Sequence, residues 1–295
     1  MKTRRPISSL SVSLCACVLA CATAHANDWL YPQTETMDAL SATASARGLT
    51  LTDQHIHLRG GMTVEKAAQR ERYSGIRSAV LENHGREWPI SNNDTLATFI
   101  EENSGRIVNG HRIAVGIQVN DRDWFKQIDP VLLKRLDFVL ADTMIMGVNA
   151  EGKPRRLWLA DVSIDNPEAW MEEYMAHNLQ ILDEPVSILA NPTYLPACIA
   201  NRYDELWTEV RMKTIIAKAV EKGVAIEVQA GSAFPKSSFL RLAKSMGAKF
   251  SFGTNNHDDK VKDLSAWLNA IELLDLRPEN LWQLKSKCPC PSSCP

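Results

Sequence analysis

The sequence predicts an α/β fold in which a parallel sheet closes into a barrel. Seven short apolar runs alternate with amphipathic stretches of helical spacing, and this alternation is typical of parallel strands joined by crossover helices. No glycine-rich phosphate fingerprint follows the first run, so the sequence favours a closed barrel over a doubly wound nucleotide-binding sheet. The chain has 295 residues, of which 45% are hydrophobic, which suffices for one domain of barrel size or two small ones.

The predicted elements follow one another along most of the chain. The strands are expected at residues 49–52, 78–81, 113–119, 138–141, 186–190, 224–228 and 249–252. The helices are expected at residues 64–73, 96–102, 130–136, 167–182, 205–222, 237–246, 264–274 and 278–284. Asp94 and Thr95 are predicted to cap one helix, and Asn166 before Pro167 to cap another.

The first 26 residues have the pattern of a signal peptide. A basic start is followed by an apolar run over residues 7–24 and by the small-x-small sequence Ala24-His25-Ala26. This pattern predicts cleavage after Ala26 and a mature protein that is periplasmic or secreted. Residues 18–21, Val-Leu-Ala-Cys, also resemble a lipoprotein processing site, which would instead anchor the protein to a membrane through Cys21.

The mature chain is predicted to consist of a barrel domain over residues 27–285 and a Cys/Pro-rich tail over residues 286–295. Its formal net charge of −2 gives no reason to expect nucleic acid or an anionic membrane as a partner. The tail could carry a disulfide or hold a soft metal, and the spacing does not determine which cysteines pair. The cysteines of the mature chain are Cys198, Cys288, Cys290 and Cys294.

Two histidines separated by one residue follow the first apolar run, in the sequence Asp53-Gln54-His55-Ile56-His57. Side chains alternate along a strand, so His55 and His57 are expected to project from the same face, where they can share one metal ion. Gly60-Gly61 then allow the backbone to turn sharply before the next helix.

Polar residues also end the other predicted strands. The active sites of parallel barrels lie at the C-terminal ends of the strands, so these residues should converge. His84 and His257 are among them, whereas His111 and His177 are expected to be structural. The other polar residues at strand ends are Glu82, Asn83, Gln118, Asn120, Asp142, Asn191, Glu227, Gln229 and Asn255.

With these motifs the chain resembles the PHP family, the polymerase and histidinol phosphatase superfamily of metal-dependent hydrolases. Residues 53–57 are similar to its D-x-H-x-H opening, and Glu82-Asn83-His84 stands where T-D-H is usual. Asn191-Pro192 stands in place of the end of a G-H-P motif, and residues 253–257 in place of G-S-D-A-H. The resemblance extends from about residue 49 to residue 284 and implies a distorted seven-stranded (β/α) barrel of the TIM-like type.

Active members of that family bind a multinuclear metal centre, and this sequence keeps only part of the ligand set. The positions that match histidine ligands are His55, His57, His84 and His257. The positions that depart from the family pattern are Asn83, Gln118 and Asn255, where carboxylates are usual, and Met144 and Asn191, where histidines are usual.

These substitutions predict a reduced metal site. A neutral amide cannot offset the charge of a hard cation, while imidazole retains affinity for zinc. We therefore expect at most one divalent transition metal, zinc rather than magnesium, or no metal at all. Three protein ligands and a water suffice for a catalytic zinc, and Asp53 is a candidate to orient the imidazoles.

The same substitutions leave a polar pocket that could bind hydroxyls or an anion without a metal. The amides that would supply donors and acceptors are Asn83, Gln118, Asn191 and Asn255. Glu82 is either a general acid or base, or the partner of Arg59 or Arg86 in a salt bridge. Both arginines could meet an anionic substrate. Further basic and aromatic residues that could contact a phosphate or a sugar are Lys153, Arg155, Arg156, Trp88 and Trp158.

Two functions are therefore compatible with the sequence. The first is an exported PHP-like hydrolase of the phosphoesterase class, in which histidines hold one ion and Glu82 and Asp53 are the catalytic residues. The second is a metal-free or catalytically degenerate protein that binds a polar or carbohydrate ligand on the same barrel. Fold analogy favours the hydrolase. In both cases the partner is a small polar or anionic molecule.

The predicted processing site is directly testable. The mature protein should begin at Asn27, because the small-x-small sequence ends at Ala26. Intact-mass spectrometry of the protein recovered from its native compartment measures this. A species that begins at a lipid-modified Cys21 would contradict the prediction and replace an exported protein by a membrane-anchored one.

Overall fold

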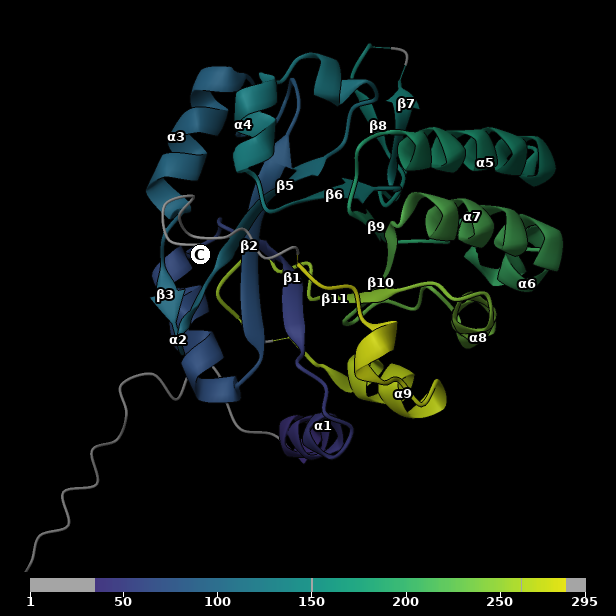
Figure 1. Ribbon diagram of the computed structural model, residues 1–295. Helices are drawn as coiled ribbons and strands as arrows, with labels where there is room; N and C mark the ends of the chain where they lie inside the picture. The colour runs from purple at the N-terminus through teal and green to yellow at the C-terminus, as the bar shows by residue number, and fades with distance from the viewer. Residues whose placement is uncertain (1–34, 150, 261, 285–295) are drawn as a thin grey trace, which may run out of the picture.

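A computed structural model describes residues 35–149, 151–260 and 262–284 and confirms the predicted fold class. Seven parallel strands close into a barrel in the order β1, β11, β10, β9, β6, β5, β2 (Figure 1). Their bounds are β1 Thr52–His57, β2 Arg77–His84, β5 Ala114–Val119, β6 Phe138–Asp142, β9 Ile188–Ala190, β10 Ala225–Gln229 and β11 Phe250–Gly253.

Helices surround the barrel, with α5 and α7 packed side by side and α2, α3 and α4 on another side (Figure 1). Their bounds are α1 Glu35–Ala46, α2 Val64–Ser74, α3 Asn93–Asn103, α4 Pro130–Arg135, α5 Pro167–Asp183, α6 Tyr203–Leu206, α7 Glu209–Lys222, α8 Ser237–Ser245 and α9 Ser265–Leu273. None of the helices in the described part of the chain is long and apolar enough to span a bilayer.

The first strand differs from its prediction in a way that matters for the site. The apolar run at residues 49–52 mostly precedes the strand, and β1 consists largely of the polar segment that was expected to follow it. Hydrophobicity did not indicate the position of this strand, because it consists largely of polar residues, some of which bind partners distant in sequence, such as Glu227 for His55. The pairing of β1 with β2 also shifts register between Asp53 and Ile56, and such a bulge re-aims neighbouring side chains.

Several helix predictions were wrong in detail. Residues 205–222 form two helices, α6 and α7, rather than one, and only the short 3-10 turn Pro278–Asn280 forms within the helix predicted at residues 278–284. The cap of α3 is Asn92, whose side chain accepts from Thr95 N, so that Thr95 lies inside the helix as part of a capping box. The predicted cap Asn166 of α5 is confirmed.

Helix α1 and two short hairpins are among the elements that were not predicted. Helix α1 packs against α9. Each hairpin pairs two strands that are two to four residues long. These hairpins are β3 Ile107–Val108 with β4 His111–Arg112, and β7 Ile145–Val148 with β8 Pro154–Arg156. The predicted signal peptide and the Cys/Pro-rich tail lie outside the described residues, while Cys198 is an exposed free cysteine.

The interior of the barrel is divided into an apolar and a polar layer. Small and branched apolar side chains from β2, β5, β6, β9 and β10 form a cluster, against which Trp282 and Leu284 pack. The backbone of Trp282 is fixed there, because its amide donates to Phe250 O at 2.8 Å. The end of the described chain therefore stabilises the apolar layer.

Two truncations test this role. A chain that stops after Lys285 should keep its stability, since the contacts of Trp282 and Leu284 remain. A chain that stops after Leu281 should lose about 2–4 kcal/mol, because large apolar side chains leave the barrel core. The measurement is urea unfolding followed by circular dichroism. Equal stabilities of the two chains would contradict the assignment of Trp282 and Leu284 to the core.

Candidate functional site

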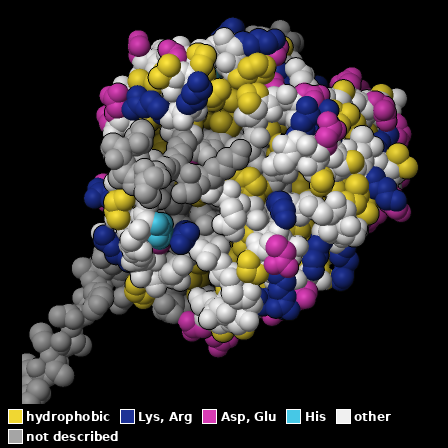
Figure 2. Space-filling model, in the orientation of Figure 1, with side chains coloured by type: hydrophobic (Ala, Val, Ile, Leu, Met, Phe, Trp, Pro, Cys, Tyr) yellow, Lys and Arg dark blue, Asp and Glu magenta, His cyan; other side chains and the backbone are white. Residues whose placement is uncertain are grey.

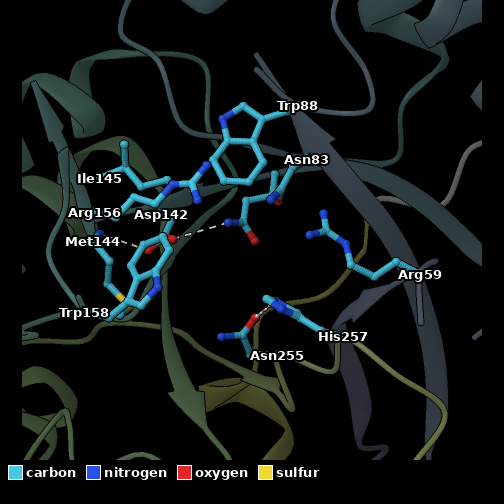
Figure 3. Close-up of a pocket in the computed structure, with 11 residues that line it drawn as sticks. Arg59, Asn83, Trp88, Asp142, Met144, Ile145, Arg156, Trp158, Asn255 and His257 are labelled. Atoms are coloured by element: carbon cyan, nitrogen blue, oxygen red, sulfur yellow. Dashed lines mark hydrogen bonds between the residues drawn. The ribbon is translucent and has the colours of Figure 1, made fainter. Parts of the chain in front are cut away.

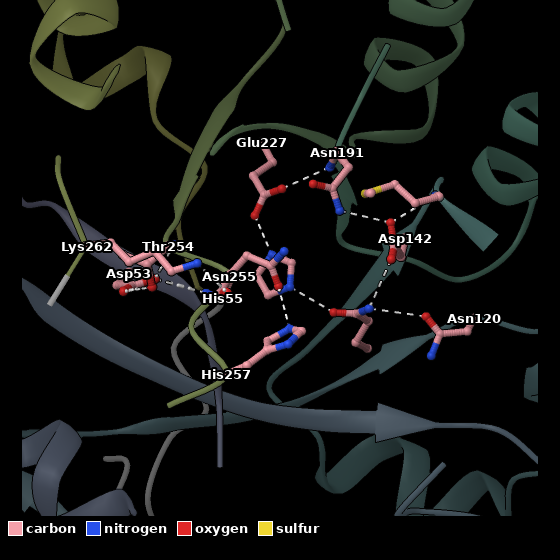
Figure 4. A network of polar contacts seen from close by, with 12 residues as sticks. Asp53, His55, Asn120, Asp142, Asn191, Glu227, Thr254, Asn255, His257 and Lys262 are labelled. Atoms are coloured by element: carbon pink, nitrogen blue, oxygen red, sulfur yellow. Dashed lines mark hydrogen bonds and ion pairs between the residues drawn. The ribbon is translucent and has the colours of Figure 1, made fainter. Parts of the chain in front are cut away.

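A closed ring of hydrogen bonds fills the polar layer and connects five strands (Figure 4). His55 on β1 contacts Glu227 Oε1 on β10 through Nδ1 at 2.6 Å and Gln118 Oε1 on β5 through Nε2 at 2.8 Å. Gln118 Nε2 donates to Asp142 Oδ2 on β6 at 3.3 Å. Asn191, just after β9, donates from Nδ2 to Asp142 Oδ1 and from its backbone to Glu227 Oε2, each at 2.9 Å. We call these five residues the polar ring.

The polar ring holds His55 as a cation. Both ring nitrogens of His55 face oxygens, and Gln118 must present its oxygen there because its nitrogen donates to Asn120 and Asp142. Burial lowers the pKa of an imidazole, but the carboxylate of Glu227 outweighs this effect and raises the pKa of His55 above its ordinary value. Burial also raises the pKa of Asp142. His55 is therefore committed to bonds within the protein.

The backbone around the polar ring is adapted to it. A Cβ atom at Gly253 on β11 would collide with Glu227 Oε1 and lie 2.7 Å from His55 Cβ, so only glycine leaves room for the His55–Glu227 pair. Asn191 and Asn255 adopt left-handed conformations with φ of 50° and 49°, which asparagine tolerates better than most residues. Part of the reason for asparagine at these two positions is thus conformational.

His57 lies beside the polar ring and has different chemistry. It is fully buried, its ring centroid is 5.2 Å from that of His55, and both its nitrogens lack a hydrogen-bond partner among the described residues. Its Nδ1 is 3.5 Å from Glu82 Oε1. Burial lowers the pKa of His57 to about 3, so that it is neutral at pH 7.

Glu82 forms the salt bridge with Arg59 that the sequence offered as one alternative. Arg59 Nε donates to Glu82 Oε2 at 3.1 Å, and Arg59 Nη2 contacts Glu82 Oε1. Despite burial, the nearby His57 and hydrogen bonds from Arg59 and the amide of Asn83 lower the pKa of Glu82 to about 2. A carboxylate with so low a pKa is a poor general acid or base near neutral pH.

The other two predicted ligand histidines lie nearer the surface. His257 is exposed, and its Nε2 contacts Asn255 Oδ1 at 2.9 Å, which leaves Nδ1 with the lone pair. Burial of part of the ring and the positive charges of Arg59, His55 and Lys262 lower its pKa to about 4. His84 is buried, and its Nδ1 has no partner among the described residues.

These histidines do not form the predicted metal site as they stand. His57 and His257 are in contact, with ring centroids 4.4 Å apart, but both nitrogens of His55 are engaged in the polar ring. Within the described ranges, no three His, Cys, Asp or Glu side chains converge in a way that could hold an ion. The number of bound metals stays a prediction, and the donor set seen here does not fit a multinuclear centre.

Above the polar ring lies a pocket of about 330 Å³ (Figure 3). Trp88 and Arg156 stack at one side of it, with the guanidinium carbon 5.0 Å from the centroid of the indole. Asn255 and His257 lie at another side, near Arg59 (Figure 3). The lining residues are Arg59, Asn83, Trp88, Gln118, Asp142, Met144, Ile145, Arg156, Trp158, Asn255 and His257.

The structure brings together most, not all, of the predicted site residues. Arg86 is exposed and does not line the pocket, although its backbone amide donates to Asp121. Asp53 binds Thr254 and the backbone amide of His55, so it positions the backbone of His55 rather than an imidazole ring. Asn191 lies in the polar ring below the pocket.

Sequence reasoning missed how two carboxylates and one hairpin contribute. Asp142 and Glu227 were noticed only as strand-end residues, yet they link three other members of the polar ring. The hairpin β7–β8 brings Ile145 and Arg156 to the pocket. Its strands are too short to give a periodic pattern, so no feature of the sequence indicated it.

No protein family model matches the chain, and no curated protein matches it.

The low pKa of His57 predicts loss of stability in acid. An unfolded chain binds a proton on this histidine below pH 6.5, whereas the folded chain does so only near pH 3. Stability attributable to His57 should thus fall as the pH drops below 6.5, by at most about 1.4 kcal/mol per pH unit.

The measurement is the free energy of unfolding in urea between pH 3.5 and 7.5. His57→Gln should flatten this dependence. His177→Gln is a matched comparison, because burial also lowers the pKa of His177 to about 3 at a site in α5. An unchanged slope in His57→Gln would show that His57 is charged or solvated in the folded protein.

Proposed function

We propose that the pocket above the polar ring binds a small, polar, anionic molecule and that it does so without a multinuclear metal centre. The observation that carries this proposal is Arg156. It lines the pocket, stacks on Trp88, and forms no ion pair with any carboxylate of the described residues. An unpaired guanidinium in a pocket is a ready partner for a carboxylate or phosphate.

The surroundings of Arg156 support an anion of limited size. The pocket volume of about 330 Å³ is near the lower end of the range for ligand sites, about 300–1,000 Å³. Basic and acidic side chains are interspersed over the face seen in Figure 2, which offers no broad basic surface to a polyanion. The expected ligand is therefore a small molecule.

The protonation states favour binding over metal-free acid–base catalysis. Efficient general acids and bases have pKa values near the working pH. In the pocket, His257 has its pKa lowered to about 4, and beside it Glu82 has its pKa lowered to about 2 and is paired with Arg59. Neither group is tuned to exchange protons at neutral pH.

Hydrolysis of a phosphoester with one bound ion is a second candidate function. Its support is His57, whose two nitrogens are unpartnered in a fully buried position next to His257. A buried imidazole without partners is rare and is explained when an ion or water occupies the neighbouring space. His55 would first have to leave the polar ring to join such a site.

Arg156→Gln tests the proposed function. A panel of small carboxylates and phosphates is titrated by calorimetry into protein dialysed against a chelator. Binding should survive chelation, and Arg156→Gln should weaken it roughly 10- to 100-fold, the value of a hydrogen-bonded charge.

Arg155→Gln is the matched control, because Arg155 is the neighbour of Arg156 in β8 but does not line the pocket. Binding that disappears on chelation would favour the second candidate, especially if one equivalent of zinc is lost in the variant with His55→Ala and His57→Ala. Equal effects of the two arginine variants would contradict a specific role of Arg156.

A further inference from the structure

The pocket lining contains neutral hydrogen-bonding groups as well as Arg156. Asn83 is 3% exposed, and its Oδ1 has no partner among the described residues, so an acceptor is left without a donor. Asn255 uses its Oδ1 for His257, and its amide nitrogen points away from that contact (Figure 3). Asn83 therefore offers an acceptor and Asn255 a donor to a ligand, apart from Arg156.

This pair of groups restricts the chemistry of the ligand. Asn83 Oδ1 requires a donor, which an ionised carboxylate or phosphate cannot supply. A hydroxyl both donates and accepts, so it can meet Asn83 and Asn255 alike. A buried acceptor that stays unpaired costs about 1–3 kcal/mol, so a ligand that satisfies it gains selectivity over one that does not. The ligand needs hydroxyl groups near Asn83 and Asn255.

The carboxylate oxygens of Asp142 are engaged by neighbouring donors rather than by Arg156. Asp142 lines the pocket, but its Oδ1 accepts from Asn191 Nδ2 and Met144 N, and its Oδ2 accepts from Gln118 Nε2. Its oxygens are thus directed to the polar ring. The guanidinium of Arg156 lies against Trp88 instead.

Trp158 supplies an apolar surface to the pocket. It lies two residues after β8, lines the pocket and is 42% exposed, so much of its indole is uncovered. An exposed indole in a polar pocket favours a ligand with one apolar face. The C–H face of a sugar ring combines such a face with hydroxyls at its edge.

Resting on the proposed function, we infer that the ligand is a single sugar ring that carries an acidic group. The acidic group binds Arg156, the ring lies on Trp158, and hydroxyls bind Asn83 and Asn255. The pocket volume of about 330 Å³ suits one ring rather than an oligosaccharide. The acidic group is a carboxylate or a phosphate, which share the chemistry that Arg156 recognises.

Calorimetry with five probes tests this inference on the full purified protein. The probes are glucuronate, glucose 6-phosphate, glucose, succinate and inorganic phosphate. At least one acidic sugar should bind about 10-fold or more tightly than glucose, because it adds a charged hydrogen bond. It should also bind about 10-fold or more tightly than the simple anion with the same acidic group, because its ring stacks on Trp158. The preferred acidic sugar tells whether a carboxylate or a phosphate is recognised.

Two variants separate the sugar from the anion. Trp158→Ala should lower the affinity for the acidic sugar about 10-fold and leave the affinity for the simple anions unchanged. Trp158→Phe should keep most of the affinity for the acidic sugar. Since Trp158 is exposed, both variants should fold, which circular dichroism checks.

The outcomes distinguish the inference from the function on which it rests. If succinate or phosphate binds as tightly as the acidic sugars and Trp158→Ala has no effect, the inference of a sugar ligand is wrong, while the proposed anion binding is still supported. If none of the five probes binds and Arg156→Gln changes no other anion affinity, both are wrong.

Discussion

A buried imidazolium is the constraint on which the site depends. His55 is fully buried inside the barrel, where an unpaired charge would be very costly, and it is retained because Glu227 and Gln118 bind both of its nitrogens. The other members of the polar ring satisfy these partners in turn, so that no oxygen of Glu227 or Asp142 is left without a donor. Gly253 has no side chain because any Cβ would displace this pair. The charge of His55 therefore depends both on the residues of the polar ring and on the close approach of β11 at Gly253.

The same constraint accounts for two amides of the polar ring, Gln118 and Asn191. At position 118 a carboxylate would add a negative charge next to Asp142, whereas glutamine accepts from His55 with its oxygen and donates to Asp142 with its nitrogen. At position 191 asparagine donates to Asp142 and also tolerates the left-handed backbone. The imidazolium of His55, bonded at both nitrogens, is the positive charge around which these groups are organised.

The fold was more predictable than the site because burial leaves a pattern and hydrogen bonding does not. Six of the seven strands were apolar runs that periodicity identifies, and their helices followed from amphipathic spacing. β1 was displaced in the prediction because several of its polar residues bind partners distant in sequence, such as Thr254 for Asp53.

The site was harder to predict. Deciding between a salt bridge and an acid–base role for Glu82 required knowledge of where Arg59 lies, and the contribution of Arg156 depends on a hairpin of two very short strands. Such long-range contacts have no local signature in the sequence.

The distribution of charge also determines how a ligand must lie. Interior charges are matched among themselves, since His55 contacts Glu227 in the polar ring and Glu82 is paired with Arg59. A ligand that carried a negative charge down to the polar ring would meet Glu227 and Asp142 without an available cation. Arg156 is the cation of the pocket lining without a carboxylate partner among the described residues, and it comes from the hairpin rather than from the barrel. The acidic end of a ligand is therefore held at the hairpin, while its neutral, hydrogen-bonding end faces Asn83 and the interior.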